Sequence, residues 1–370
     1  MVNKNNIKSI LFLLHLPPPV HGSSIIGKTI YDSEFINTKF KCSYINLLAS
    51  KDVASTGKLS FFKLMGFVKT FFILLHKLKN VKPLLCYYAI TATGAAFFKD
   101  VLLIFILKLF KVKLVYHMHN KGVRNYKDNF FYRICYKYVF YKSEVILLSS
   151  ILYSDIDMFV PKNRIHICPN GISEIIKIEN TNENSNRNQF SILFLSNLIE
   201  TKGVYILIEA CYLLKYKGYE FNCIFIGGEG DINKELFEKK TTELDLNEIV
   251  KYEGKKYGLD KVQYFKSASV FVFPTYYQNE TFGLVNLEAM QYSLPIISTY
   301  EGGIPDIVED GITGFLVPQR NVQQLADKIE ILINNRHLAT EMGKAGRKKY
   351  ENKFTIDIFE NRLVSILENI

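Results

Sequence analysis

Two glutamates near the start of a predicted helix have a spacing that suits substrate binding. Glu280 and Glu288 have seven residues between them, in a stretch, 275–295, that reads as a loop, a helix and a tight exit into a strand. Glu288 lies almost two turns into the helix, and helical side chains lean back toward the N-terminus. Its carboxylate is therefore expected to face the helix start, beside which Glu280 lies. Either glutamate alone is better explained as a solvated charge.

The start of this helix is a candidate anion site, formed by Phe282, Gly283 and Leu284. A helix start offers unpaired backbone N–H groups and the positive end of a dipole. Glycine lets an anion approach the backbone closely. The two carboxylates would repel a phosphate but would accept hydrogen bonds from hydroxyl groups beside it. A phosphate between two hydroxyl-rich groups is the chemistry of a nucleotide-sugar.

Other polar residues follow predicted strands, at the edge where open α/β sheets bind ligands. In the first half of the chain, Gly22 and Ser23 form a turn after the strand of residues 8–14, and His119 follows the strand of residues 113–118. His119 could donate a hydrogen bond to a sugar hydroxyl or a phosphate oxygen. An ordinary strand-to-helix turn and a structural histidine are the simpler explanations of these residues. In the second half, Lys202 and Gly228 follow the strands of residues 190–195 and 221–226, and the Lys202 ammonium could meet a diphosphate.

The charge of the chain is unevenly distributed. The 370 residues carry a net charge of +10; residues 1–180 have 25 Lys and Arg against 10 Asp and Glu, a net +15, and residues 181–370 have 21 against 26, a net −5. A basic half indicates an anionic partner, either nucleic acid or an anionic membrane surface. No nucleic-acid-binding module is recognisable. The six cysteines form no C-x-x-C pair, so a zinc site or a disulfide framework is not indicated and a reducing cytosol fits.

A basic amphipathic helix is predicted over residues 60–83. Apolar residues recur there with a helical period, and five lysines interrupt them without any acid. Such a helix can lie in a membrane interface, although a core helix with a solvated lysine face explains the pattern equally well. The excess of positive charge in residues 1–180 favours the membrane. No apolar run is long enough to span one, and residues 10–16 do not form a convincing signal peptide.

Strands and helices alternate twice along the chain, which predicts an α/β protein of two domains with parallel sheets. The expected division is an N-terminal domain of residues 1–177, a polar linker of residues 178–189, a second domain of residues 190–350 and a C-terminal helix in residues 351–370. A ligand is expected in a cleft between the carboxyl ends of the two sheets.

Together these motifs resemble the retaining glycosyltransferases of family 4, along essentially the whole chain and most strongly from Phe190 to Pro318. The family's E-x7-E motif matches Glu280 to Glu288, its K-G matches Lys202-Gly203, and its closing segment matches EGGIPDIVEDGITGFLVP from Glu301. The resemblance implies the GT-B fold, with two facing Rossmann-like domains, an interdomain cleft and a C-terminal helix that crosses back to the N-terminal domain.

The resemblance also implies roles for individual residues. Glu288 would hold the ribose of the nucleotide, and Glu280, as a catalytic residue, would contact the hydroxyls of the transferred sugar. The other catalytic residues would be His119, which would contact the sugar, and Lys202, which would hold the diphosphate. The donor-binding residues would further include Gly22, Ser23, Asn197, Gly228, Phe282, Gly283 and Leu284. Neither a cofactor nor a metal would be needed, since amides, a helix dipole and Lys202 can stabilise the departing nucleoside diphosphate.

One position departs from the family pattern. Asn197 stands in Ser196-Asn197-Leu198 where the family usually has the Arg of a G-R-L beside the phosphates. One cation is therefore missing. Asn197 would donate neutral hydrogen bonds instead, or another basic residue such as Lys255 would replace the arginine, or the activity would be weaker.

The sequence thus predicts a cytoplasmic enzyme at the inner face of the plasma membrane. It would transfer a hexose-type sugar from a nucleoside-diphosphate sugar to a glycan acceptor, which we expect to be lipid-linked, in the synthesis of a bacterial-type surface polysaccharide or lipopolysaccharide. Nucleic acid is not an expected partner. The alternatives are another GT-B enzyme, such as a sugar-nucleotide epimerase, and a non-catalytic protein that binds nucleotide-sugars, for which Asn197 would be a sign of lost activity.

Overall fold

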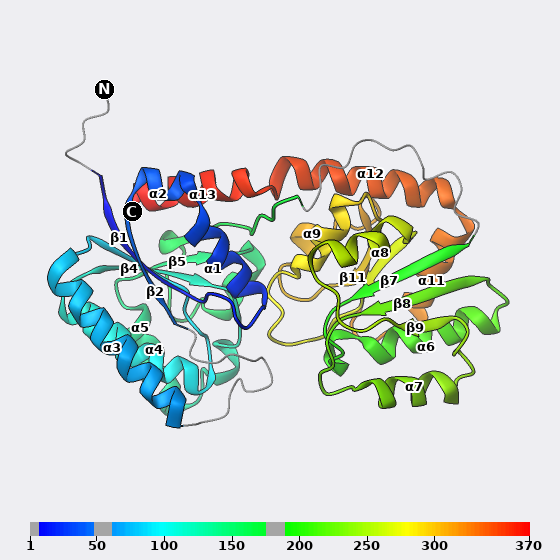
Figure 1. Ribbon diagram of the computed structural model, residues 1–370, viewed down its shortest axis with the longest axis horizontal. Helices are drawn as coiled ribbons and strands as arrows, with labels where there is room; N and C mark the ends of the chain where they lie inside the picture. Colours follow the sequence, from blue (N-terminus) through cyan, green and yellow to red (C-terminus); the bar gives the residue numbers. More distant parts are fainter. Residues whose placement is uncertain (1–6, 48–60, 175–188) are drawn as a thin grey trace. The chain divides into compact units, whose positions relative to one another are not determined.

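The computed structural model describes residues 7–47, 61–174 and 189–370, without the side chains of residues 61–64. The chain divides into two units. The N-terminal unit contains residues 1–170 and 357–370, and the C-terminal unit contains residues 171–356 (Figure 1). Each unit is built on one six-stranded parallel sheet with helices on both faces, which confirms the predicted pair of Rossmann-like domains.

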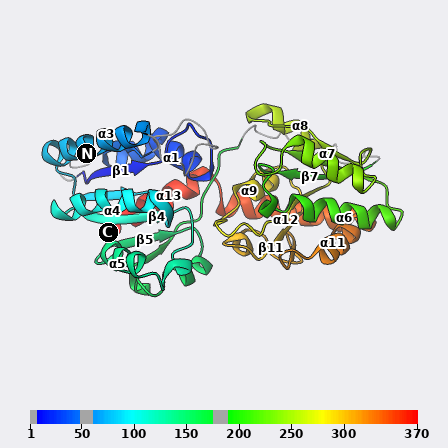
Figure 2. The same cartoon turned by 90° about the horizontal axis from the view of Figure 1, so that it is seen from below.

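The sheet of the N-terminal unit has the strand order β2-β1-β3-β4-β5-β6. Helices α3, α4 and α5 lie together on one face of this sheet, and α1, α2 and α13 lie on the other (Figures 1 and 2). The strands are β1 (Ser9–Leu14), β2 (Lys41–Asn46), β3 (Leu85–Tyr88), β4 (Lys113–Met118), β5 (Glu144–Leu147) and β6 (Ile165–Ile167). The helices are α1 (Gly22–Asp32), α2 (Glu34–Lys39), α3 (Phe61–Val81), α4 (Gly94–Leu109), α5 (Phe130–Phe140) and α13 (Ile356–Asn369).

The sheet of the C-terminal unit has the strand order β12-β11-β10-β7-β8-β9. The direction of strand addition therefore reverses between β7 and β10, which makes the carboxyl ends of these two strands the place where such sheets bind ligands. The strands are β7 (Phe190–Leu195), β8 (Phe221–Ile226), β9 (Val250–Tyr252), β10 (Val270–Phe273), β11 (Ile296–Thr299) and β12 (Gly314–Val317). The helices are α6 (Val204–Tyr216), α7 (Lys234–Glu243), α8 (Val262–Ser267), α9 (Leu284–Gln291), α10 (Ile304–Ile307), α11 (Val322–Asn334) and α12 (Arg336–Lys353).

The central strands are apolar on both faces because helices cover both sides of each sheet. Residues 10–14 of β1 are at most 1% exposed, and the four residues of β10 are equally buried. These continuous apolar runs are the signal that predicts the strands from the sequence, and β7 and β8 have the predicted bounds. The short helices α2 and α8 were not predicted.

The C-terminal helix returns to the N-terminal unit, as expected from the family resemblance. Residues 357–370, which include all but the first residue of α13, belong to that unit, and the Lys8 ammonium donates hydrogen bonds to the carbonyls of Leu367 and Glu368, at 2.9 and 3.1 Å. A cation is favourable there because the last carbonyls of a helix carry partial negative charge. The C-terminal unit begins at Gly171, because the backbone N–H of Ile172 donates to the carbonyl of Phe354 at 3.0 Å.

Two expectations concern segments that lie partly outside the described residues. The predicted linker of residues 178–189 lies, apart from its last residue, outside the described residues. The predicted basic helix of residues 60–83 is α3, whose side chains are described from Met65 onward. Among the described residues, none of the helices combines the length and the apolar character that crossing a bilayer requires.

Candidate functional site

Lys202 is placed by a left-handed glycine at the end of the β7 loop. Gly203 caps α6 with a φ of +91°, and a Cβ atom added to it would lie 2.3 Å from the carbonyl oxygen of Pro274. Only glycine fits this position, because the conformation and the space both exclude a side chain. The tight packing joins the loop after β7 to the loop after β10, and Tyr276 N–H donates to the carbonyl of Thr201 at 2.8 Å. The Lys202 side chain is thereby brought to the switch point between the two strands.

Lys202 and Glu280 form an ion pair at this switch point. The Lys202 Nζ and Glu280 Oε2 atoms are 2.5 Å apart, and the two side chains are 15% and 12% exposed. The ammonium also lies 4.4 Å from the centre of the Tyr277 ring, a cation–π contact. An ammonium has three N–H donors and no acceptor, so Glu280 occupies one donor and leaves others for an anion. The residues predicted to hold the diphosphate and the sugar are therefore direct neighbours.

The segment after β11 supports the loop that carries Glu280. Gly303 N–H donates to the carbonyl of Thr281 at 2.8 Å. At Gly302, whose φ is +56°, an added Cβ would lie 2.4 Å from the carbonyl oxygen of Glu280. The Gly-Gly pair of the predicted closing segment thus permits backbone contact between two loops, which fixes the position of the Glu280 main chain.

Helix α9 begins at Leu284, two residues later than predicted. Gly283 adopts a φ of +74°, outside the helical range, and is the N-cap without any side-chain cap. The first N–H groups of the helix therefore have no intrahelical partner. Phe282 is buried at 1% exposure and serves as packing rather than as part of the helix. Next to Gly283, the side-chain amide of Asn286 is fully buried and has no hydrogen-bond partner among the described residues.

Glu288 forms a second ion pair, which the sequence analysis missed. Its Oε2 atom lies 2.5 Å from the Nζ atom of Lys261, and both side chains are 15% exposed. Lys261 ends a short 3₁₀ turn that leads into α8. No local pattern marks this lysine, because the pairing depends on how α8 and α9 pack on the sheet. Both candidate carboxylates of the C-terminal unit thus have a lysine partner.

Asn197 and Gly228 lie together at the ends of β7 and β8. The Gly228 N–H donates to Asn197 Oδ1 at 3.2 Å, and Leu198 N–H donates to the Gly228 carbonyl at 2.8 Å. Asn197 therefore uses its side-chain oxygen to hold the glycine turn. A Cβ added to Gly228 would be 3.1 Å from Asn197 Oδ1 and 3.7 Å from Lys255 Cδ. The Lys255 side chain thus lies beside Asn197 and Gly228, and its ammonium is 4.8 Å from the centre of the Tyr257 ring.

His119 lies in a cluster of histidines at the carboxyl edge of the N-terminal sheet. Its ring centre is 4.1 Å from that of His117, and the rings of His15 and His21 are 6.1 Å apart. Burial, and after it the charges of His117, His15 and His21, hold the pKa of His119 well below its usual range. His119 is therefore neutral, as a partner of uncharged hydroxyl groups should be. Figure 2 shows the elements that carry the cluster, β1, α1 and β4, in this unit.

Two histidines of the cluster have clear structural roles. His117 is fully buried and its Nδ1 atom shares a hydrogen bond of 2.5 Å with the Tyr87 hydroxyl. Burial lowers the pKa of His117 to about 3. His21 caps α1 by accepting from Ser24 N–H.

Gly22 and Ser23 are the first two residues of α1, directly after β1 and its proline turn. Gly22 is exposed. The Ser23 hydroxyl lies 2.8 Å from His15 Nδ1 and is hydrogen-bonded to it. Burial, followed by the charges of His21 and Lys99, lowers the pKa of His15 to about 3. A neutral imidazole thus orients the serine hydroxyl at a helix start.

The predicted site residues form two groups, one on each unit. Lys202, Glu280 and the start of α9 lie at the carboxyl ends of the neighbouring strands β7 and β10, and Asn197 and Gly228 lie at the ends of β7 and β8. Gly22, Ser23 and His119 lie at the carboxyl edge of the N-terminal sheet. Within each unit, therefore, strand topology brings together residues that are far apart in the sequence.

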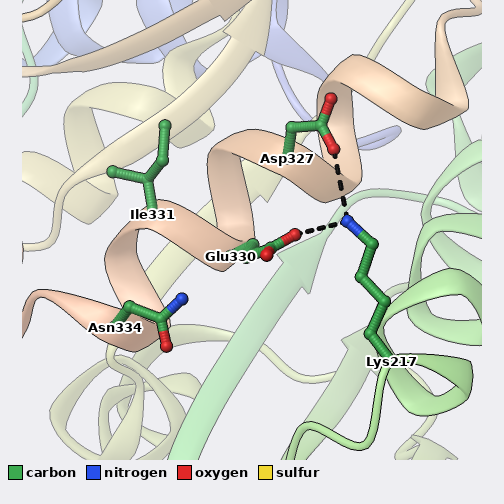
Figure 3. Close-up of a pocket in the computed structure, with 5 residues that line it drawn as sticks. All are labelled: Lys217, Asp327, Glu330, Ile331 and Asn334. Atoms are coloured by element: carbon green, nitrogen blue, oxygen red, sulfur yellow. Dashed lines mark hydrogen bonds and ion pairs between the residues drawn. The ribbon is translucent and has the colours of Figure 1, made fainter.

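A separate pocket of the C-terminal unit contains none of the predicted residues. It is lined by Lys217, Asp327, Glu330, Ile331 and Asn334, where the end of α6 packs on α11 (Figure 3). Lys217 Nζ lies 2.5 Å from Glu330 Oε2 and 3.5 Å from Asp327 Oδ1. Its ammonium is thus occupied by two carboxylates from one helix, which indicates a structural pair that fastens the end of α6 to α11. Among residues 7–47, 61–174 and 189–370, His, Cys, Asp and Glu side chains form no group of three that could hold a metal.

The comparison with known protein families identifies the C-terminal half of the chain. Residues 176–349 match the family described as glycosyl transferases group 1. This match contains Lys202, Glu280 and Glu288. The resemblance to glycosyltransferases is confirmed at this level: residues 176–349 are similar to the glycosyl transferases group 1 family.

Similar proteins are found among curated sequences and solved structures. The chain is 29% identical over 240 residues to "Capsular polysaccharide biosynthesis glycosyltransferase CapM" of Staphylococcus aureus, with 62% of each chain covered. It is 30% identical to "Amylovoran biosynthesis glycosyltransferase AmsK" of Erwinia amylovora, over 64% of this chain and 58% of the relative. The matches thus span about three fifths of the length of these relatives. Anabaena Alr3699/HepE, solved in complex with UDP, superimposes with a TM-score of 0.76 at 20% identity and covers 98% of this chain and 100% of its own. This likeness confirms the GT-B fold.

Proposed function

We propose that this protein is a retaining glycosyltransferase that uses a nucleoside-diphosphate sugar as donor. The observation that carries the proposal is the Lys202–Glu280 ion pair at the β7/β10 switch point of a glycosyl transferases group 1 domain. A cation for phosphate and a carboxylate for hydroxyl groups stand side by side there, which suits the junction between a diphosphate and a sugar. Two relatives bear names of polysaccharide glycosyltransferases, and HepE has been solved in complex with UDP-glucose.

In the proposed reaction, the C-terminal unit stabilises the departing nucleoside diphosphate. The N–H groups at the start of α9 and the Lys202 ammonium supply positive charge where negative charge develops. Glu280 accepts hydrogen bonds from hydroxyls of the transferred sugar, and Glu288 accepts them from the ribose. No metal is required in this scheme, because the protein's own dipoles and ammonium groups neutralise the leaving group.

We assign the role of the missing arginine to Lys255. Asn197 is engaged with the Gly228 turn, while the Lys255 side chain lies against the same glycine. Glu280 and Glu288 are each neutralised by a lysine, so a further cation is needed to offset the charge of a diphosphate. Lys255 is the basic side chain placed to supply it.

The N-terminal unit binds the acceptor and completes the donor site in this proposal. His119, which is neutral, donates a hydrogen bond to the transferred sugar, and Gly22 and Ser23 contact the diphosphate. The acceptor is a glycan, and we propose that it is lipid-linked and belongs to a surface polysaccharide pathway. The basic N-terminal unit would then work at the cytoplasmic face of an anionic membrane.

Release of nucleoside diphosphate from a panel of nucleotide-sugars tests the proposed function. The expected result is donor-dependent release by the wild-type protein, increased by a glycan acceptor, and lost in Glu280→Gln. Glu248→Gln is the matched control, since the Glu248 side chain is 97% exposed on the same unit. Retention is tested separately by the anomeric configuration of the product.

A second candidate function is favoured by Asn197. Without an arginine at this position the domain would bind nucleotide-sugars without transferring the sugar. The two functions give different results in the same experiment: a binding protein shifts its melting temperature with a donor but releases no nucleoside diphosphate from it.

A further inference from the structure

Helices α4 and α5 present an exposed apolar surface on the N-terminal unit. It consists of Phe98, Leu102, Phe105 and Leu109 of α4 with Phe130 and Ile134 of α5, which are between 40% and 69% exposed. We call these six residues the apolar face. The spacing of four, three and four residues along α4, and of four along α5, places each set in one stripe of its helix.

The two stripes form one continuous surface. Helix α4 contacts α3 on one side and α5 on the other, and the three helices lie together on one face of the sheet (Figures 1 and 2). The ring centres of Phe105 and Tyr138 of α5 are 6.4 Å apart, and those of Phe98 and Tyr132 are 4.9 Å apart. Phe72 of α3, 63% exposed, adds a further aromatic side chain on the third helix.

The outward stripe of α4 is not needed for packing. Helix α4 already buries Phe97, Leu103, Ile104, Ile106 and Leu107 against the unit. A helix at the surface of a globular protein normally carries polar residues on its outer side, and one that is apolar all round is normally buried. The structure therefore indicates that something else covers the outer stripe.

The charge around the apolar face is almost entirely positive. The three helix segments contain eight Lys and Arg against one acid, Asp100. Asp100 is buried at 6% exposure, and it accepts hydrogen bonds from the Tyr88 hydroxyl and the Thr91 N–H. Lys108 joins the two helices: its ammonium donates to the carbonyls of Tyr138 and Tyr141 and lies 4.7 Å from the centre of the Tyr138 ring. The partner of this surface is therefore apolar and negatively charged.

We propose that the apolar face docks into the interface of an anionic lipid bilayer, with the surrounding Lys and Arg on the lipid headgroups. Phenylalanine and leucine enter the acyl boundary, while lysine stems lie along it and keep their ammonium groups in water. A second copy of this chain is a poorer occupant, because two such faces would bring like charges together. A nucleic acid would match the charge but would leave the apolar stripes without a partner.

This inference deepens the proposed function, because a lipid-linked acceptor would be presented at such a surface. It moves the membrane contact from α3, where the sequence suggested it, to α4 and α5. The membrane surface depends on the proposed function only through the lipid-linked acceptor. Vesicle binding is measurable whether or not the protein transfers a sugar.

Sedimentation of the full chain with lipid vesicles tests the proposal. The wild-type protein is expected to bind vesicles of phosphatidylcholine with phosphatidylglycerol, to bind pure phosphatidylcholine vesicles much more weakly, and to lose binding as salt is raised. Phe105→Ser with Leu109→Ser is expected to weaken binding by at least about tenfold. The matched control is Tyr212→Ser with Tyr216→Ser on α6, two exposed side chains of the C-terminal unit, which should bind as the wild type does.

Equal binding of the Phe105/Leu109 variant and the wild type would overturn the assignment of the face, and equal binding to neutral and anionic vesicles would overturn the role of charge. A wild-type dimer in ultracentrifugation that the variant abolishes would identify a second copy as the occupant. The melting temperature of the variant should match that of the wild type, and so should its release of nucleoside diphosphate without acceptor. Failure of that release in the wild type would count against the proposed function and leave the vesicle result standing.

Discussion

The two units share an architecture but differ in where their chemistry lies. Each has a six-stranded parallel sheet with helices on both faces. In the C-terminal unit the notable groups are the ion pairs at the strand ends, and its outer helices are ordinary. In the N-terminal unit the strand ends hold neutral histidines, while the outer helices carry unusual surfaces. The six most exposed phenylalanines of the described chain all lie in the N-terminal unit, at 38% to 71% exposure.

The difference follows from what each unit is proposed to bind. A small, doubly charged donor requires paired charges in a confined place, which loops at a switch point provide. A lipid-linked acceptor requires an extended surface, which only the helices can provide. The net charges of +15 for residues 1–180 and −5 for residues 181–370 agree with this division. Substitutions on the outer helices of the N-terminal unit should therefore leave donor binding unchanged, and substitutions at the switch point of the C-terminal unit should leave vesicle binding unchanged.

The largest effect is expected for Glu280→Gln. The change keeps the size of the side chain but removes the charge that faces Lys202 and the sugar hydroxyls. Sugar transfer should fall by at least about a hundredfold, measured as acceptor-dependent product formation. Binding to anionic vesicles should stay unchanged, because the carboxylate lies in the C-terminal unit. Transfer within a few-fold of the wild type would remove Glu280 from the reaction.

Lys202→Ala should have the next largest effect, on binding of a nucleoside diphosphate. Loss of a charge-assisted hydrogen bond to phosphate costs about 1.5–3 kcal/mol, so calorimetry should record roughly 10- to 100-fold weaker binding. Lys251→Ala is the matched control, since Lys251 of β9 is 51% exposed and pairs loosely with Glu248 at 3.8 Å. Unchanged affinity in Lys202→Ala would exclude contact of this lysine with the phosphates.

Lys255→Ala tests whether this lysine replaces the missing arginine. A weaker effect than that of Lys202→Ala is expected, about tenfold on the same calorimetric affinity, because no carboxylate of the described residues is paired with Lys255, whose ammonium lies over the Tyr257 ring. Asn197→Arg in the Lys255→Ala background should restore part of the lost affinity. If Lys255→Ala binds the nucleoside diphosphate as the wild type does, the arginine has no substitute at this position.

His117 should make the stability of the N-terminal unit depend on pH. Its pKa is lowered to about 3 by burial, whereas an unfolded histidine has a pKa of about 6.5. The unfolded state binds the proton first as the pH falls, so stability is complete above about pH 6.5 and declines toward about pH 3. Asp100 acts in the opposite sense, because burial raises its pKa to about 6 and its contribution is lost as the pH rises through that value.

The variant His117→Gln isolates this contribution, because it leaves Asp100 in place and can still accept from the Tyr87 hydroxyl. Between about pH 7 and about pH 5 the wild type should lose about 2 kcal/mol more unfolding free energy than the variant. Urea unfolding measures the difference. The signal that is followed is the protease resistance of the peptides that contain β3 and β4. If the unfolding free energies of the wild type and the variant change with pH in parallel, His117 is not held neutral by the fold.

The strands and long helices could be predicted from the sequence because their signals are local. Buried parallel strands read as apolar runs, and β7 and β8 have the predicted bounds. The ion pairs could not be predicted in the same way. Lys202 and Glu280 are 78 residues apart, and their contact results from the order of β7 and β10 together with the packing of Gly203 on Pro274. The start of α9 was placed two residues early because a left-handed Gly283 leaves no mark on the apolar period.

Lys261 shows the limit of a motif most clearly. The E-x7-E spacing identifies Glu288, but the lysine that pairs with it at 2.5 Å lies on another element, which was not predicted. The two side chains are only 15% exposed. Because the Lys261 ammonium contacts one carboxylate oxygen of Glu288, the other oxygen can accept a hydrogen bond from a hydroxyl group. If this is its role, Lys261 acts through Glu288 and has no effect of its own on the nucleotide.

A double-mutant cycle distinguishes a lysine that positions Glu288 from a lysine that contacts the nucleotide directly. Lys261→Met alone should weaken binding of a nucleoside diphosphate by a few-fold, about 0.5–1 kcal/mol, the smallest effect predicted here. In the Glu288→Gln background the same substitution should change nothing, because the carboxylate that it positions is gone. A loss of equal size in both backgrounds would mean that Lys261 contacts the nucleotide directly. In that case Lys261 would be a further cation at the nucleotide, beside Lys202, and the missing arginine would not require Lys255 as its substitute.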